Sequence, residues 1–191
     1  IVESIKLTCQ NEGEILPKTD ELVAKIKSGL DLTPTQIAAD EGLLNQKITA
    51  SPEALKYYLE SRKYFMTAEY PKVIGLCEKA IEIDPANAES YYNRGVIYSG
   101  KQEFTKAIPD YDKYIAMVTD PAMLGDAYMN RGIAYAYTPG GMEKAVVDFT
   151  KVIELKPNWP NGYLARGMIY RELKKNDLAA ADEKKAASLQ K

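Results

Sequence analysis

The chain has 191 residues, of which 46% are hydrophobic and 27% are charged, and its net charge is -2. This near-neutral balance argues against a nucleic-acid platform, which is normally strongly basic, and no run of ~18 apolar residues exists to cross a membrane. Histidine is absent, and the two cysteines, Cys9 and Cys77, form no metal or redox motif. Because histidine is the commonest general base and metal ligand, we expect no metal, no cofactor and no catalytic centre.

Residues 1–50 form a leader that differs from the rest of the chain. Apolar and polar residues alternate loosely over 1–8, which predicts a short strand. An amphipathic helix is predicted over 18–28, and a second short helix over 33–44. The helix prediction rests on the spacing of Leu22, Val23, Ile26 and Leu30. Two interpretations stay open: the remnant of an α/β module, or a helical cap on the segment that follows.

From residue 51 onward the sequence repeats. The pattern Tyr-x-x-x-Gly-x-x-Tyr occurs three times, and each copy is followed by an alanine that opens a second helical stretch. Self-similarity with a period in the thirties is typical of stacked helical pairs. A weaker copy begins at Ala54, where Ser61 replaces the glycine and Val73 the alanine. The three full copies are Tyr91, Gly95, Tyr98 and Ala107; Tyr128, Gly132, Tyr135 and Ala145; and Tyr163, Gly167, Tyr170 and Ala179.

The repeated residues have physical reasons to recur. A glycine inside a helix costs ~1 kcal/mol relative to alanine, so its presence indicates that a neighbouring helix approaches closely. The two tyrosines of each copy are seven residues apart, lie on one helical face, and are expected to fill the space between paired helices. An arginine precedes each glycine, at Arg94, Arg131 and Arg166. These three either form a ladder for an anionic ligand or pair locally with acidic residues across the helix pair, which we favour.

This pattern resembles the tetratricopeptide repeat (TPR) family. The resemblance implies an all-α fold, a right-handed superhelix of four helix-turn-helix repeats preceded by a short strand and helix leader. The expected TPR domain covers 51–191, with repeats near 54–87, 88–124, 125–159 and 160–191. The leader resembles, through residues 48–58, the segment that precedes TPR arrays in multidomain bacterial signalling proteins. A bacterial origin is therefore expected.

Several irregularities interrupt the array. Three residues are added around 119–121 and one in the turn 138–141, either as part of a binding face or as neutral loop growth. Pro109 falls inside a predicted helix and should kink it. These features predict an uneven superhelix around 105–125. In the last repeat Glu183 replaces the large residues of the earlier repeats, which predicts a solvent-exposed terminal helix and the end of the array.

The resemblance also implies a binding site, because the first helix of each TPR pair lines a concave groove. Asn93 and Asn130 are the predicted contacts to a peptide backbone, since an amide side chain can bond both N–H and C=O groups. The lining is rather apolar for a surface, and the leader helix is a competing occupant. The predicted groove residues are Tyr58, Arg62, Tyr92, Asn93, Val96, Met129, Asn130, Ile133, Tyr137 and Met168.

The function expected from this resemblance is a non-catalytic scaffold that binds a peptide or helix of another protein. The alternative is a structural, regulatory or oligomerisation part of a larger bacterial signalling or envelope protein, and both cytoplasmic and periplasmic locations fit. A cochaperone that captures a C-terminal carboxylate is not expected, because the residues at the clamp positions match only at Asn93. Those positions hold Tyr58, Arg62, Asn93, Asp126 and Asn130.

Overall fold

The computed structural model describes residues 49 and 51–190. Over these residues the chain forms eight helices and no strand, so the all-α prediction is confirmed there. The strand predicted over 1–8 and the helices predicted over 18–28 and 33–44 lie outside the described residues. The helices are α3 (Pro52–Met66), α4 (Tyr70–Ile83), α5 (Ala88–Gly100), α6 (Phe104–Met117), α7 (Pro121–Ala136), α8 (Met142–Leu155), α9 (Pro160–Glu172) and α10 (Asn176–Leu189).

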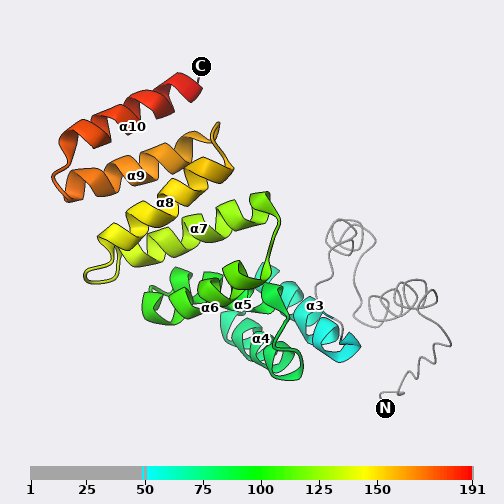
Figure 1. Ribbon diagram of the computed structural model, residues 1–191. Coiled ribbons are helices and arrows are strands. Elements are labelled where there is room, and N and C mark those ends of the chain that lie inside the picture. Colours follow the sequence, from blue (N-terminus) through cyan, green and yellow to red (C-terminus); the bar gives the residue numbers. More distant parts are fainter. Residues whose placement is uncertain (1–48, 50, 191) are drawn as a thin grey trace, which may run out of the picture.

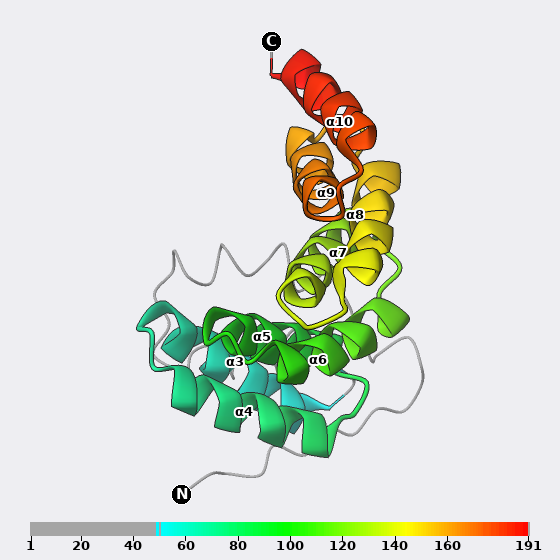
Figure 2. The ribbon, with the colours of Figure 1, turned by 90° about the vertical axis from the view of Figure 1, so that its left-hand side faces the viewer.

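The helices form four successive helix-turn-helix pairs, as the sequence predicted. Each helix packs against the next one along the chain, and α5 also contacts α7. Figure 1 shows the pairs following one another from α3 to α10. In Figure 2, turned by 90°, α7 to α10 rise away from the layer formed by α3 to α6. Each pair therefore depends on its sequence neighbours for packing.

The first helix of three pairs begins at a side chain that caps its free N–H groups. Ser51 accepts a bond from the Ala54 amide at 3.3 Å, and Asn87 accepts one from the Ser90 amide at 3.1 Å. Asp120 accepts bonds from the first turn of α7 at 2.8 and 3.2 Å. Such a cap contributes ~1 kcal/mol, so these residues fix where α3, α5 and α7 begin.

The three residues added around 119–121 lengthen helix α7 and not the linker before it. The linker between α6 and α7 is residues 118–120, no longer than the linkers 84–87 and 156–159. Helix α7 has 16 residues, whereas α5 and α9 have 13 each. Asp120 as the cap and Pro121 in the first turn start α7 early, so the insertion lengthens the helix. Pro109 is exposed on α6, which is helical on both sides of it.

The repeated glycines and alanines allow the two helices of a pair to approach closely, as expected. A Cβ added to Gly95 would lie 3.1 Å from the Tyr111 ring, and one added to Gly132 would lie 2.7 Å from the Phe149 ring. At Gly167 it would lie 3.4 Å from a carbonyl oxygen of the opposite helix. The alanines on that side are fully buried at Ala107, Ala145 and Ala179.

Cys77 is a free thiol in the core and packs with Val73 and Ile97. Burial raises the pKa of the Cys77 thiol to about 11. The thiolate is the reactive form of cysteine, so this residue is inert at neutral pH.

Candidate functional site

The three repeated arginines bind acidic side chains within their own helix pairs. Arg94 donates two hydrogen bonds to Asp110 at 2.9 and 2.7 Å. The same two-bond geometry joins Arg131 to Asp148 at 2.8 and 2.7 Å, and Arg166 to Asp182 at 2.8 Å for both bonds. The three aspartates are buried, with at most 6% of each residue exposed. Local pairing, the favoured interpretation, is therefore confirmed.

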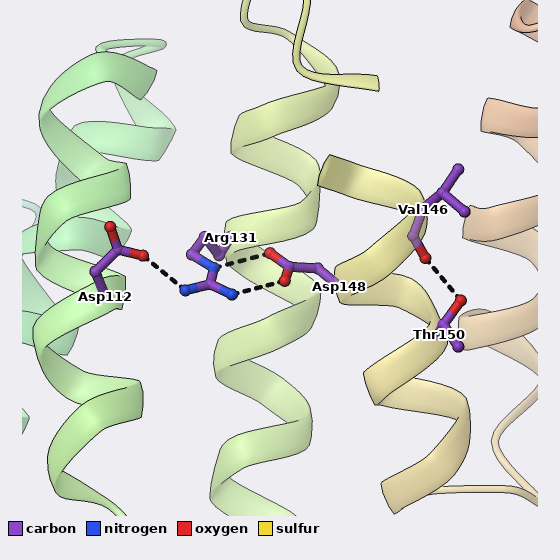
Figure 3. A network of polar contacts seen from close by, with 5 residues as sticks. All are labelled: Asp112, Arg131, Val146, Asp148 and Thr150. Atoms are coloured by element: carbon purple, nitrogen blue, oxygen red, sulfur yellow. Dashed lines mark hydrogen bonds and ion pairs between the residues drawn. The ribbon is translucent and has the colours of Figure 1, made fainter. Parts of the chain in front are cut away.

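Each arginine also reaches the second helix of the preceding pair. Arg131 donates to Asp112 on α6 at 2.6 Å, so its guanidinium lies between two carboxylates (Figure 3). Arg166 donates to the Thr150 hydroxyl at 3.0 Å, and Arg94 lies 4.0 Å from Glu78. We call Arg94, Arg131 and Arg166 with these partners the arginine ladder. Because its charges are satisfied inside the protein, the ladder is not a site for an anionic ligand.

Burial and pairing act against each other on the charges of the ladder. Burial opposes the charge of Arg131, but the bonds to Asp148 and Asp112 outweigh burial and raise the pKa of Arg131. Burial raises the pKa of Asp148, although Arg131 favours its ionised form. The rings of Tyr128 and Tyr135 lie 5.3 and 5.8 Å from the guanidinium and add cation–π contacts. The tyrosines of the motif therefore flank its arginine.

Two predicted groove residues, Tyr92 and Asn130, are bound to each other. The Asn130 amide donates to the Tyr92 hydroxyl at 2.9 Å and joins α7 to α5. The Tyr92 ring packs 4.7 Å from the Tyr114 ring and 6.0 Å from the Tyr111 ring, measured between ring centres. Tyr92 and Asn130 therefore link the second and third pairs.

Asn93 differs from Asn130, because it is only half-buried and has no side-chain partner within residues 49 and 51–190. Its amide keeps both a donor and an acceptor available for a peptide backbone. At the first pair, Tyr58 is 2% exposed, so its ring is not at the surface of the described structure. Arg62 is half-buried and already has an interaction partner.

Glu89 on α5 is a buried acid that the sequence reasoning did not single out. It is 9% exposed and hydrogen-bonded to Tyr114. Burial raises the pKa of Glu89, although the Tyr114 hydroxyl and the charge of Arg62 favour the ionised carboxylate. Glu89 lies in the first turn of α5, where acidic residues are common and usually exposed. The sequence therefore gave no sign that this residue is buried.

Three predicted groove residues are exposed, one on α7, one in the turn that follows α7 and one on α9. Ile133, Tyr137 and Met168 are 38%, 71% and 66% exposed. Met129 and Ile133 are four residues apart on α7 and share one face of it, and Tyr137 is the first residue after that helix. Met168 lies on α9. Met129 packs on the same core cluster as Ala165 of α9. We call Met129, Ile133, Tyr137 and Met168 the apolar patch.

Four of the five charged side chains on α7 and α9 are paired, and within the described residues Glu172 at the end of α9 is the exception. Lys156 donates to Asp126 of α7 at 2.5 Å, and Arg171 of α9 donates to Glu183 at 2.6 Å. Val96, the remaining predicted groove residue, is half-buried against the α6 cluster of Ala107 and Tyr111. Large exposed apolar side chains that lie together are typical of an interaction surface.

The described residues contain neither a metal centre nor a membrane span. Within 49 and 51–190 no group of three or more acidic, cysteine or histidine residues could hold a metal ion. In the same part of the chain, none of the helices is long and apolar enough to cross a membrane.

The comparisons with known sequences point to one repeat family. Residues 76–108 match the family model described as tetratricopeptide repeat. The chain is 24% identical over 102 residues to photosystem I assembly protein Ycf3 of Synechococcus sp. (strain CC9902), covering 51% of this chain and 58% of that protein. It is 24% identical over 172 residues to tetratricopeptide repeat protein 16 of Mus musculus, covering 86% of this chain and 22% of that protein. The chain thus spans less than two thirds of each relative.

Solved structures share the arrangement of the helices. The crystal structure of MamA superimposes with a TM-score of 0.67 and 22% identity, and 96% of each chain is covered. The first TPR of Spaghetti (RPAP3), bound to the HSP90 peptide SRMEEVD, gives a TM-score of 0.59 and 26% identity. That match covers 68% of this chain and 99% of the other.

Proposed function

We propose that this chain, whose described helices form a tetratricopeptide repeat superhelix, is a non-catalytic scaffold that binds another protein on α7 and α9. The observation that carries this proposal is the apolar patch, where Ile133, Tyr137 and Met168 are 38%, 71% and 66% exposed. A contiguous patch of large exposed apolar side chains commonly marks an interaction site. Methionine suits such a surface because its flexible, polarisable side chain adapts to the partner.

The chemistry of the patch favours an apolar segment over an acidic peptide. The RPAP3 domain was solved with the acidic peptide SRMEEVD, but here Asp126 and Tyr58 stand at two of the carboxylate-clamp positions. Asp126 is already paired with Lys156 at 2.5 Å. An amphipathic helix laid with its apolar face on the patch is the recognition mode that fits. Asn93 would contribute a polar contact at the edge of the complex.

Peptide selection followed by binding measurements tests this proposal. A phage library of random 16-residue peptides would be selected on the immobilised chain. The tightest peptides would then be synthesised with fluorescein and titrated by fluorescence polarisation. We expect Met168→Lys to weaken binding at least tenfold, because a buried unpaired charge costs several kcal/mol. Val147→Lys is the matched control, since Val147 is 59% exposed on α8.

Two results would contradict the proposal. Equal affinity of the selected peptides for the wild type and Met168→Lys would remove the apolar patch as the binding surface. Light scattering would show whether a second copy of the chain occupies the patch instead. A dimer that Met168→Lys dissociates would replace the peptide-binding proposal with an oligomerisation role.

A further inference from the structure

The turn between α7 and α8 differs from the other three turns within helix pairs. It has five residues, 137–141, whereas the turns 67–69, 101–103 and 173–175 have three each. Gly140 has a φ of 71°, and a Cβ at Gly141 would overlap the Tyr135 carbonyl oxygen. The turn is held by two internal hydrogen bonds. The Thr138 hydroxyl donates to the Ala134 carbonyl at 2.8 Å, and the Thr138 backbone carbonyl accepts from the Gly141 amide at 2.9 Å. This longer turn therefore has a defined shape.

The longer turn forms one wall of a surface pocket. The pocket has a volume of about 330 Å³, and its lining includes Tyr137, Pro139, Met142 and Glu143 together with Leu173 from the turn after α9. Pockets for small molecules usually start at roughly 300 Å³, so this one suits a single large side chain better than a cofactor. It lies where the third and fourth pairs meet.

Tyr137 belongs to both the pocket and the apolar patch. Its ring stacks on the Phe104 ring of α6, with 5.2 Å between ring centres and 13° between planes. That stacking supports the tyrosine from the second pair while 71% of it stays exposed. A segment lying on the patch would therefore pass directly beside the pocket.

Glu143 gives the pocket a charge. It is exposed, it is the charged member of the lining, and it forms no ion pair within residues 49 and 51–190. A free carboxylate at the rim of an apolar pocket complements a basic side chain next to an apolar anchor. Interfaces obtain most of their affinity from such central anchors, with charges at the rim setting orientation.

We infer that the partner segment inserts one bulky apolar side chain into this pocket and pairs an adjacent lysine or arginine with Glu143. This inference rests on the proposed function, because the pocket adjoins the apolar patch. It assigns a role to the longer turn, and it commits to an apolar segment that carries a basic residue.

The peptides selected on the wild-type chain also test this inference. We expect the enriched sequences to contain Lys or Arg beside a large apolar residue. Glu143→Lys should weaken their binding at least fivefold, and replacing the basic residue of the peptide by Glu should restore affinity for Glu143→Lys only. The matched control is Glu82→Lys, because Glu82 is also exposed but lies on α4. This substitution should change the binding affinity less than twofold.

The outcomes separate this inference from the proposed function. Peptides that respond to Met168→Lys but not to Glu143→Lys would overturn the pocket inference and leave the binding scaffold intact. Enriched peptides without a basic residue would have the same meaning. Peptides that respond to neither variant, or a selection that enriches none above an unrelated immobilised protein, would count against both. Circular dichroism and thermal melting would confirm that each variant is folded.

Discussion

Arg131 shows how one side chain can hold three helices together. Its guanidinium bonds to Asp148 on α8 and Asp112 on α6, while its own backbone belongs to α7. The Asp148 side chain is 2% exposed and Arg131 is 17% exposed, so the pair is largely removed from water. A buried ion pair adds little net stability, but breaking it leaves an uncompensated charge. Removing the arginine alone should therefore destabilise the fold more than replacing both partners of the pair.

We expect Arg131→Met to destabilise the chain by about 3–5 kcal/mol, because Asp148 stays buried without a partner. The double variant with Asp148→Leu should lose less than Arg131→Met alone. Urea unfolding followed by circular dichroism measures both. The control is Lys151→Met, which removes an exposed ion pair with Glu154 and should cost less than about 1 kcal/mol. Equal losses for Arg131→Met and Lys151→Met would contradict the structural role of the ladder.

The sequence predicted the type of each contact better than its partner. The position of Arg131 before the motif glycine was enough to favour local pairing. Its partners lie 17 residues ahead and 19 residues behind, however, and the packing of α6, α7 and α8 selects them. The peptide-binding role predicted for Asn130 depended on a free amide, and the structure places the Tyr92 hydroxyl 2.9 Å away. Whether a side chain is exposed, and whether its polar groups are already hydrogen-bonded, depends on neighbouring residues that a repeat pattern does not specify.

The turns within the helix pairs share one backbone feature that the sequence does not reveal. Each has a residue in the left-handed region, with φ of 58° at Ala68, 61° at Gln102, 58° at Lys174 and 71° at Gly140. Only the last is glycine, the residue that adopts this conformation without steric cost. A sequence reading that relies on glycine to mark such positions finds one turn in four.

Glycine substitutions should have opposite effects in a turn and in a helix. We expect Gly140→Ala to destabilise the chain by about 1 kcal/mol, because a Cβ disfavours the left-handed region. Gly75→Ala should stabilise it by a similar amount, since Gly75 lies inside α4 with nothing within 4 Å of an added Cβ. Thermal denaturation of the two variants provides the comparison. Shifts of the same sign would contradict these conformations.

On the scale of the whole array, residues 51–190 form a one-dimensional series of helix pairs, and stability should vary along that series. The helical period and the glycine spacing made this architecture predictable from the sequence. Local stability was less predictable, because it depends on what each helix buries. Helix α8 buries Phe149 and Val152, whereas the residues that α10 buries are small or charged. Burying one large apolar side chain contributes about 1.5–3 kcal/mol.

We expect the backbone amides of α10 to exchange with deuterium faster than those of α8, although both helices have 14 residues. Fewer buried apolar side chains make local opening less costly. Hydrogen exchange followed by mass spectrometry of peptic peptides would measure the difference. Equal protection of the two helices would show that the arginine ladder, through Asp182, compensates for the small core of α10.

The arginine ladder also gives the chain an order of assembly. Each arginine has one partner in the preceding helix pair, which the ribosome has already synthesised. Its other partner lies at most 17 residues further along the chain. A nascent chain can thus attach every new pair to finished structure before the next one emerges. Repeats made in this order do not have to wait for distant segments, which limits the time that unpaired helices are open to misassembly during translation.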